Sequence, residues 1–318
     1  SCPLLAAFRL RLRSMAPGWL WIPLTFWAAF AQTLRNTAQR HVVDDVGTLG
    51  ATLVRFLFGL PFALIYIAIV WAISGSSLPG VNNTFLGWVF EGAICQILAT
   101  ALLLIVMKDR NFAVGVAYSK TELVQVAVFG AVFLGDPTSL PTVIAIVLAT
   151  LGVLMLSPMD PAQRLRSMVH GWTTRSALLG FASGAGFALS AVGYRGGALA
   201  LHGVGFTLAA AYTLVWAMVV QVVLLGGWVL VRNFRTYVAM LSVWRASVAA
   251  GLMGAAASAG WFTAMAIEPV AHVRTLGLVE LFFSFAVARR FFRERLGGAE
   301  IAGAGLLTLA LAIVTLAG

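Results

Sequence analysis

Long apolar runs separated by short polar breaks dominate the pattern along the chain. A helix needs about 20 apolar residues to cross a bilayer, and ten runs approach or exceed that length. They cover residues 18–38, 48–73, 85–107, 112–134, 141–157, 175–195, 204–231, 246–267, 270–292 and 297–317. We expect turns where charges, Pro or small polar residues gather, at His41 to Asp45, Ser74 to Asn83, Lys108 to Arg110 and Asp136-Pro137. The pattern predicts an all-α integral membrane protein with ten transmembrane helices.

Composition and charge narrow the function classes. The chain of 318 residues is 61% hydrophobic and only 10% charged, which excludes a soluble enzyme. Its formal net charge of +10 is typical of basic loops that meet anionic lipid, so we expect membrane lipid and no nucleic acid as a partner. Two cysteines, Cys2 and Cys95, and four scattered histidines provide no metal-ligand spacing. We expect no metal and no cofactor.

The chain contains an internal repeat. A shift of 158 positions places Glu122-Leu123 on Glu280-Leu281 without a gap. Two intramembrane glutamates coincide by chance far less often than apolar residues do, so this pair carries the inference. Five runs per half is an odd number, so the second copy must enter the membrane from the opposite side. We therefore expect two inverted five-helix repeats, residues 17–157 and 175–317, joined by a linker at 158–174.

Short motifs in the two halves point to a family. The first half has Glu122, then Gly135-Asp136-Pro137-Thr138 and Gly152. The second has Glu280, then Arg293-Glu294-Arg295-Leu296, Gly303 and Gly305. This arrangement resembles the drug/metabolite transporter superfamily, in its ten-helix EamA-type branch, although Leu123 and Leu281 replace the Pro that often follows each Glu. The resemblance implies a multi-pass protein of the bacterial cytoplasmic (inner) membrane, similar to exporters of amino acids and other metabolites.

Polar positions inside the runs are the candidate site. An ionisable group in the bilayer costs at least about 2.5 to 3.5 kcal/mol, so we expect Glu122 and Glu280 to face a cavity or a partner. They either bind a cationic group or exchange protons along a central path, or they hydrogen-bond a neighbouring helix and hold the repeats together. Together with polar and aromatic positions at helical spacing, the predicted substrate-binding set is Trp27, Gln32, Gln96, Tyr118, Ser119, Glu122, Phe187, Ser190, Trp261, Gly277, Glu280 and Ser284.

Several further expectations concern individual side chains. Lys120 points about 200 degrees away from Glu122 on an ideal helix, so Lys120 needs another partner. Gly277 and Ser284 should leave room beside Glu280, so we expect Glu280 to matter for transport and Glu122 for folding. Arg55 is expected to snorkel to water. Tryptophans near run ends are expected at the membrane interface, namely Trp19, Trp21, Trp71, Trp88, Trp172 and Trp244.

The leading hypothesis is a secondary transporter that exports amino acids or similar small metabolites by alternating access, with a monomer sufficient and proton coupling left open. Efflux of cationic drugs is the alternative within the same class. A lipid-modifying membrane enzyme is a weaker alternative, because it needs a cluster of His, Asp or Ser at one membrane face. Most Lys and Arg residues of the connections follow odd-numbered spans, which places both termini outside the cell, whereas the resemblance places them inside.

Overall fold

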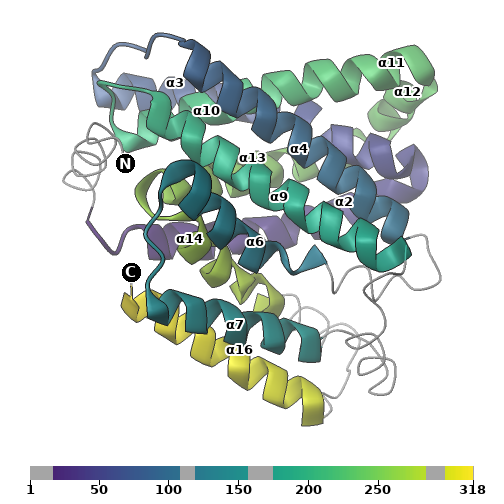
Figure 1. Cartoon of the computed structure of the whole chain (residues 1–318). Helices are drawn as coiled ribbons and strands as arrows, with labels where there is room; N and C mark the ends of the chain where they lie inside the picture. The colour runs from purple at the N-terminus through teal and green to yellow at the C-terminus, as the bar shows by residue number, and fades with distance from the viewer. Residues whose placement is uncertain (1–16, 108–118, 157–174, 284–297, 318) are drawn as a thin grey trace.

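The computed structural model describes residues 17–107, 119–156, 175–283 and 298–317, and the regular elements within these ranges are all helices (Figure 1). The first half has α2 (Trp21–Leu57), α3 (Leu60–Ser74), α4 (Asn83–Met107), α6 (Glu122–Phe129) and α7 (Leu140–Leu156). The second half has α9 (Arg175–Ala200), α10 (Phe206–Gln221), α11 (Gly227–Arg232), α12 (Arg235–Ser242), α13 (Trp244–Ile267), α14 (Val270–Leu276) and α16 (Gly298–Ala317). A π-helical turn extends α6 over Gly130–Leu134, another joins α10 to α11 over Val222–Gly226, and a 3-10 turn follows α14 over Gly277–Val279. The expected linker 158–174 lies outside the described residues.

Membrane-spanning helices agree with most of the apolar runs. Five stretches of the described residues are long and apolar enough to cross a bilayer by length and composition: Asp45–Ser74, Asn83–Leu103, Arg175–Ala200, Phe206–Arg232 and Trp244–Ile267. Glu122–Leu134, Leu140–Met155 and Ile301–Leu316 are shorter apolar helices. The chain is therefore a multi-pass membrane protein with apolar helices in both halves.

The predicted turn at His41 to Asp45 is wrong. Helix α2 continues through these charged residues, and its non-helical backbone lies at Gly47, with φ 70° and ψ 173°. A positive φ strongly favours glycine, so the chain bends at the nearest residue without a Cβ and not at the charges. A second break, at Phe58 and Gly59, separates α2 from α3 inside the run expected at 48–73. There α13 crosses closely, and a Cβ on Gly251 would lie 2.5 Å from the carbonyl carbon of Phe58.

Helix α12 was not predicted, because eight residues between two apolar runs are too few to register as a span. It packs against α2, where a Cβ on Gly50 would lie 2.8 Å from Cγ2 of Thr236. This short helix therefore covers α2 close to its bend at Gly47.

The most extensive packing between the two halves is that of α2 with α13, α4 with α9, and α7 with α16 (Figure 1). Glycines allow the close approach in each pair. A Cβ on Gly260 would lie 2.9 Å from Cβ of Ala28, and one on Gly196 would lie 2.6 Å from the Trp88 ring. Small residues favour such packing in membranes, because helices of equally apolar surface associate through contact and not through the hydrophobic effect.

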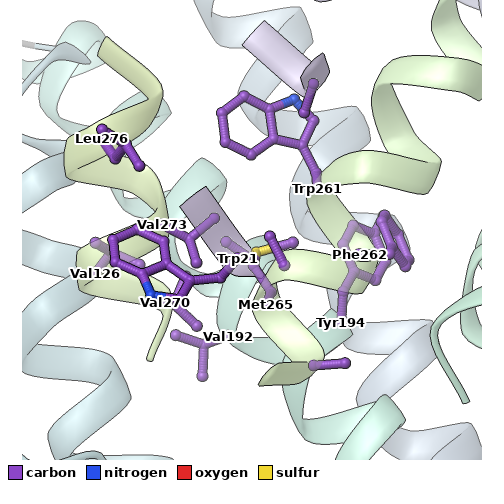
Figure 2. Close-up of a cluster of buried hydrophobic side chains, with 14 of the residues drawn as sticks. Trp21, Val126, Val192, Tyr194, Trp261, Phe262, Met265, Val270, Val273 and Leu276 are labelled. Atoms are coloured by element: carbon purple, nitrogen blue, oxygen red, sulfur yellow. The ribbon is translucent and has the colours of Figure 1, made fainter. Parts of the chain in front are cut away.

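Apolar side chains occupy both the outside of the molecule and its core. Large residues such as Ile73, at 81% exposed, and Ile65, at 55%, face outward as expected of a lipid-facing surface. The largest buried cluster includes Trp21, Val126, Val192, Met265 and Val270 (Figure 2). Polar groups are consequently concentrated between helices.

The expectation for the tryptophans holds in part. Trp19, Trp71 and Trp244 are 63%, 48% and 55% exposed, but Trp21 is completely buried. Its ring lies 6.3 Å from that of His272 on α14. A position near the end of an apolar run does not reveal which face of the helix is covered by a neighbouring helix. Here α14 covers the face of α2 that carries Trp21. Trp172 lies outside the described residues.

The packing of α7 on α16 gives a testable prediction. Gly152→Ala should lower the melting temperature of the detergent-solubilised protein, because its Cβ would lie 2.8 Å from the backbone oxygen of Gly303. Overpacking of this kind costs about 1–3 kcal/mol. Gly305→Ala is the matched control on the facing helix, where a Cβ meets nothing within 4 Å. Its higher helix propensity, about 1 kcal/mol, should leave the melting temperature unchanged or raised. Equal shifts for both variants would contradict the packing argument.

Candidate functional site

A cavity of about 1050 Å³ lies between α2, α4, α9 and α13, with α6 and α14 also contributing side chains. Its volume is at the upper end of ordinary small-molecule sites. Among the described residues, six charged side chains line it: four basic (Arg35, Arg55, Lys120 and Arg274) and two acidic (Glu122 and Glu280). Aromatic rings of Phe187, Tyr194, Trp261 and Phe262 provide apolar wall. The cavity thus combines charge and aromatic surface inside an otherwise apolar protein.

An ion pair between Glu122 and Arg274 connects the two halves of the chain. Arg274 donates from Nε to Oε1 of Glu122 at 2.8 Å and also from Nη2 to the same oxygen. The guanidinium carbon lies 5.4 Å from the centre of the Trp261 ring, a cation–π contact. Arg274, and not Lys120, is therefore the partner of Glu122, and this pairing agrees with the hypothesis that the carboxylate holds the halves together.

Glu280 is bound by a neutral group. Gln32 on α2 donates from Nε2 to Oε2 of Glu280, and its Oε1 accepts from Nε1 of Trp261 at 3.0 Å. The Trp261 ring lies against Gly277, where an added Cβ would clash with Cη2. The carboxylate of Glu280 still lines the cavity and makes no ion pair closer than 4 Å among the described residues.

Three neutral side chains form a hydrogen-bonded network on the α4 side of the cavity. Tyr194 donates from its hydroxyl to Oε1 of Gln96 at 2.9 Å, while Nε2 of Gln221 lies 2.5 Å from that oxygen and 2.8 Å from the Tyr194 hydroxyl. The Tyr194 ring stacks on Phe262, with ring centres 4.5 Å apart (Figure 2). Because these contacts fix Tyr194 and Gln96, that wall is pre-organised.

Seven of the twelve predicted site residues line the cavity: Gln32, Gln96, Glu122, Phe187, Ser190, Trp261 and Glu280. Gly277 borders a smaller adjoining space with Glu122 and Glu280. Ser119 is buried, and its backbone oxygen packs against Gly184. Tyr118 and Ser284 lie outside the described residues.

Trp27 was placed in the cavity wrongly. Its side chain is 49% exposed and lies 6.4 Å, ring to ring, from Phe30. Five residues separate it from Gln32, about 140 degrees around an ideal helix, so the two side chains point to different sides of α2. Closeness in sequence to the polar positions of α2 did not show on which face of the helix Trp27 lies.

The sequence interpretation missed the basic wall of the cavity. Arg35 follows Gln32 by three residues and therefore shares its helix face. Arg55 was expected to snorkel, yet it lines the cavity with Thr48 and Thr52. The signal was present in both cases, because a basic residue within an apolar run is by default a candidate for function.

A second polar cluster, the buried lock, consists of Asp136, Arg195, Glu268 and His272. Arg195 Nη1 donates to the backbone oxygens of Met265 and, at 2.7 Å, of Glu268. Its Nε and Nη2 each lie 3.2 Å from a carboxylate oxygen of Asp136. Met265 also lines the cavity, so the lock lies directly behind one end of it.

His272 extends the lock to both halves. Its Nδ1 lies 2.7 Å from Oε1 of Glu268, and its Nε2 shares a hydrogen bond of 2.8 Å with Thr142 of α7. All four lock residues are at most 7% exposed. Asp136 and Thr142 belong to the first half, and the other members to the second, so the lock joins the two halves. Within the described residues, no three His, Cys, Asp or Glu side chains gather as metal ligands would.

Comparison with known proteins shows which family the first half of the chain resembles. Residues 19–157 match the sequence profile of the EamA-like transporter family. This part of the chain is similar to that family. The EamA-like segment carries Gln32, Arg35, Arg55, Glu122 and Asp136, and so provides one side of both the cavity and the lock. The recognition of an EamA-type unit from the motif at Glu122 and Gly135 is confirmed.

Solved structures support the fold over nearly the whole length. One of the 26 matching chains is described as a crystal structure of a protein, with 15% sequence identity and a TM-score of 0.64. The match covers 93% of this chain and 96% of the other. The fold therefore extends beyond the EamA-like segment into the second half. No curated protein matches the chain.

The Glu122–Arg274 pair predicts energetic coupling between the halves. Glu122→Gln and Arg274→Gln should each lower the melting temperature, and the double variant should lose less than the sum. Contacting charged residues typically couple by about 0.5–3 kcal/mol. Thermal unfolding of the two single variants and the double variant measures this. Pairing Glu122→Gln with Arg245→Gln, whose guanidinium lies over the exposed Trp244 ring, should give additive effects. Additive changes in melting temperature for both pairs of variants would refute the coupling.

Proposed function

We propose that the protein is a secondary transporter that moves a small organic metabolite, amino acids foremost, out of the cell by alternating access. The observation that carries the proposal is a large, charge-lined cavity between the two halves, with a buried network of charges that joins the halves next to it. A carrier needs a central site and a closure that can be exchanged between its two ends. The EamA-like segment supports a transport role.

The two halves, residues 17–157 and 175–317, are proposed as inverted five-helix repeats. Helix positions support this: adding 158 to Asn83, the start of α4, gives 241, three residues before Trp244, the start of α13. Contacts support it as well, because α4 packs on α9 as α13 packs on α2, and the shift relates α2 to α9 and α4 to α13. Such symmetry allows the closed and open ends to interchange during transport.

The charges of the cavity support an amino acid better than a cationic drug. An amino acid presents a carboxylate to Arg35 or Arg55 and an ammonium group to Glu280, while its side chain can contact Phe187 or Trp261. Four basic side chains against two acidic ones oppose a substrate with only positive charge. An enzymatic reaction on lipid is weakened by the positions of the described His202 and His272, which lie on different segments away from the cavity lining.

The direction of transport follows from the end that is open. The cavity extends along α2 from Gln32 to Thr52 and Arg55, and Asn36 is exposed on its lining. The lock, with Trp21 beside His272, occupies the opposite end. The distribution of basic residues places the connection after the first span in the cytoplasm and both termini outside. On this orientation the cavity loads from the cytoplasm, as an exporter requires.

Reconstituted protein tests the transport proposal. Liposomes containing the purified protein should exchange labelled amino acids in a counterflow assay, and Glu280→Gln should reduce the rate at least about tenfold, because the ammonium group loses its charged partner. Arg245→Gln, on the exposed Trp244, should transport at the wild-type rate. Absence of flux for a panel of amino acids, sugars and organic cations would refute the proposal. Wild-type flux by Glu280→Gln would refute the role of Glu280.

The lock gives a separate prediction. Asp136→Asn leaves Arg195 buried with a neutral partner, so local opening should become easier. Hydrogen exchange of the backbone amides at Glu268, His272 and Val273 should accelerate at least about tenfold, equivalent to about 1.4 kcal/mol. Amides in α12, remote from the lock, should exchange at the wild-type rate. Unchanged exchange at all these amides would show that the ion pair does not close the cavity.

A further inference from the structure

We infer that Arg35 and Arg55 form an anion-binding subsite and that the ligand of the cavity is an organic acid held through a carboxylate. The inference deepens the proposed transport function by assigning the substrate class, and it rests on that function only for the step from binding to flux. It excludes substrates that carry positive charge alone.

Among the described residues, neither arginine is in an ion pair. Arg35 donates from Nε and Nη2 to Oδ1 of its neighbour Asn36, at 3.2 and 2.8 Å, and this is a neutral acceptor. The guanidinium of Arg55 lies 4.4 Å from the centre of the Phe56 ring. Within the described residues, no carboxylate oxygen lies within 4 Å of either guanidinium. Both groups are therefore charged and uncompensated at short range.

Basic side chains outnumber acidic ones among the described residues of the cavity. Glu122 is paired with Arg274, while Glu280 is hydrogen-bonded by the neutral Gln32, keeps its charge and interacts electrostatically with Arg35. Four basic groups against two acidic ones leave positive charge in excess, and Lys120 is one of the four. A negative ligand is the simplest source of compensation.

Arg35 and Arg55 stand next to each other across Gly254 of α13. A Cβ at Gly254 would lie 3.4 Å from Cδ of Arg35 and 3.6 Å from Cβ of Arg55. Each is close enough to the other to interact electrostatically, and Arg35 also interacts with Glu280 and Arg274. Two neighbouring like charges repel each other when they lie out of bulk water, and an anion between them removes that repulsion. Their proximity is therefore explained by an occupant.

A carboxylate matches the donors that are available. Guanidinium groups bind carboxylates through two parallel N–H···O bonds, which fixes orientation as well as charge. Nearby on α2, Asn36, Thr48 and Thr52 offer neutral hydrogen bonds to the remaining polar atoms of a ligand. The aromatic side of the cavity, at Phe187 and Phe262, can contact its carbon skeleton.

Glutarate and cadaverine test the inference, because both have five carbons but opposite charge. Binding to the full chain is measured by isothermal titration and by the shift in melting temperature, in neutral detergent without anionic lipid. Wild type should bind glutarate and not cadaverine. Arg35→Gln and Arg55→Gln should each weaken glutarate binding at least tenfold, Arg55→Lys should retain part of it, and Arg245→Gln should leave it unchanged. If one Gln variant does not fold, the other and Arg55→Lys provide the test.

The outcomes separate this inference from the transport proposal. Equal glutarate affinity in wild type and the folded variants, preference for cadaverine, or no binding of glutarate at millimolar concentration would each overturn the subsite. Added phosphatidylglycerol that displaces glutarate without itself being displaced by excess glutarate would identify a lipid headgroup as the occupant and likewise overturn it. Binding through both arginines without flux in liposomes would uphold the subsite and refute transport. Flux of amino acids that is insensitive to both variants would uphold transport and refute the subsite.

Discussion

The structure depends on one constraint: a charge carried into the bilayer must be enclosed by protein. Apolar side chains such as Ile65 and Ile73 occupy the outer surface, so ionisable groups can only be placed between helices. There they connect parts of the chain that are distant in sequence. Glu122 reaches Arg274, 152 residues further on, and Asp136 reaches Arg195. The Glu122–Arg274 pair therefore both joins the halves and lines the cavity.

Charged groups at the two ends of the cavity differ in how completely they are satisfied. In the lock, Arg195 engages a carboxylate and two backbone oxygens, and His272 bonds at both ring nitrogens. At the other end, the contacts of Arg35 and Arg55 among the described residues are an amide oxygen and an aromatic face. Buried charges held by a counterion serve structure, whereas charges left without one inside a cavity are poised for a ligand. Partnering is thus a physical criterion for separating architectural residues from binding residues.

The helices were predictable from the apolar runs, because the length needed to cross a bilayer leaves few alternatives. The bend at Gly47 was misplaced at His41 to Asp45, since charges mark turns in soluble proteins, whereas here the helix continues through them and bends at the nearest glycine. Gln32, Gln96 and Glu280 were found because the positions of polar residues identify a helix face. Trp27 was misassigned because its angle of about 140 degrees from Gln32 around the helix was not taken into account. That Arg274 pairs with Glu122, or that Trp21 is buried against α14, depends on which helices become neighbours, and one sequence does not specify this.

Helix α2 carries both Trp21, beside His272 of the lock, and Arg35, in the cavity wall. They are 14 positions apart, which corresponds to about 21 Å of helix, and the helix has no break before Gly47. A ligand on Arg35 and the state of the lock therefore act on the same rigid element. Thermodynamic linkage is reciprocal, so any change in the lock that alters ligand affinity implies an equal change in lock stability on binding. This helix thus provides a physical route by which occupancy of the cavity and closure of its far end become one equilibrium.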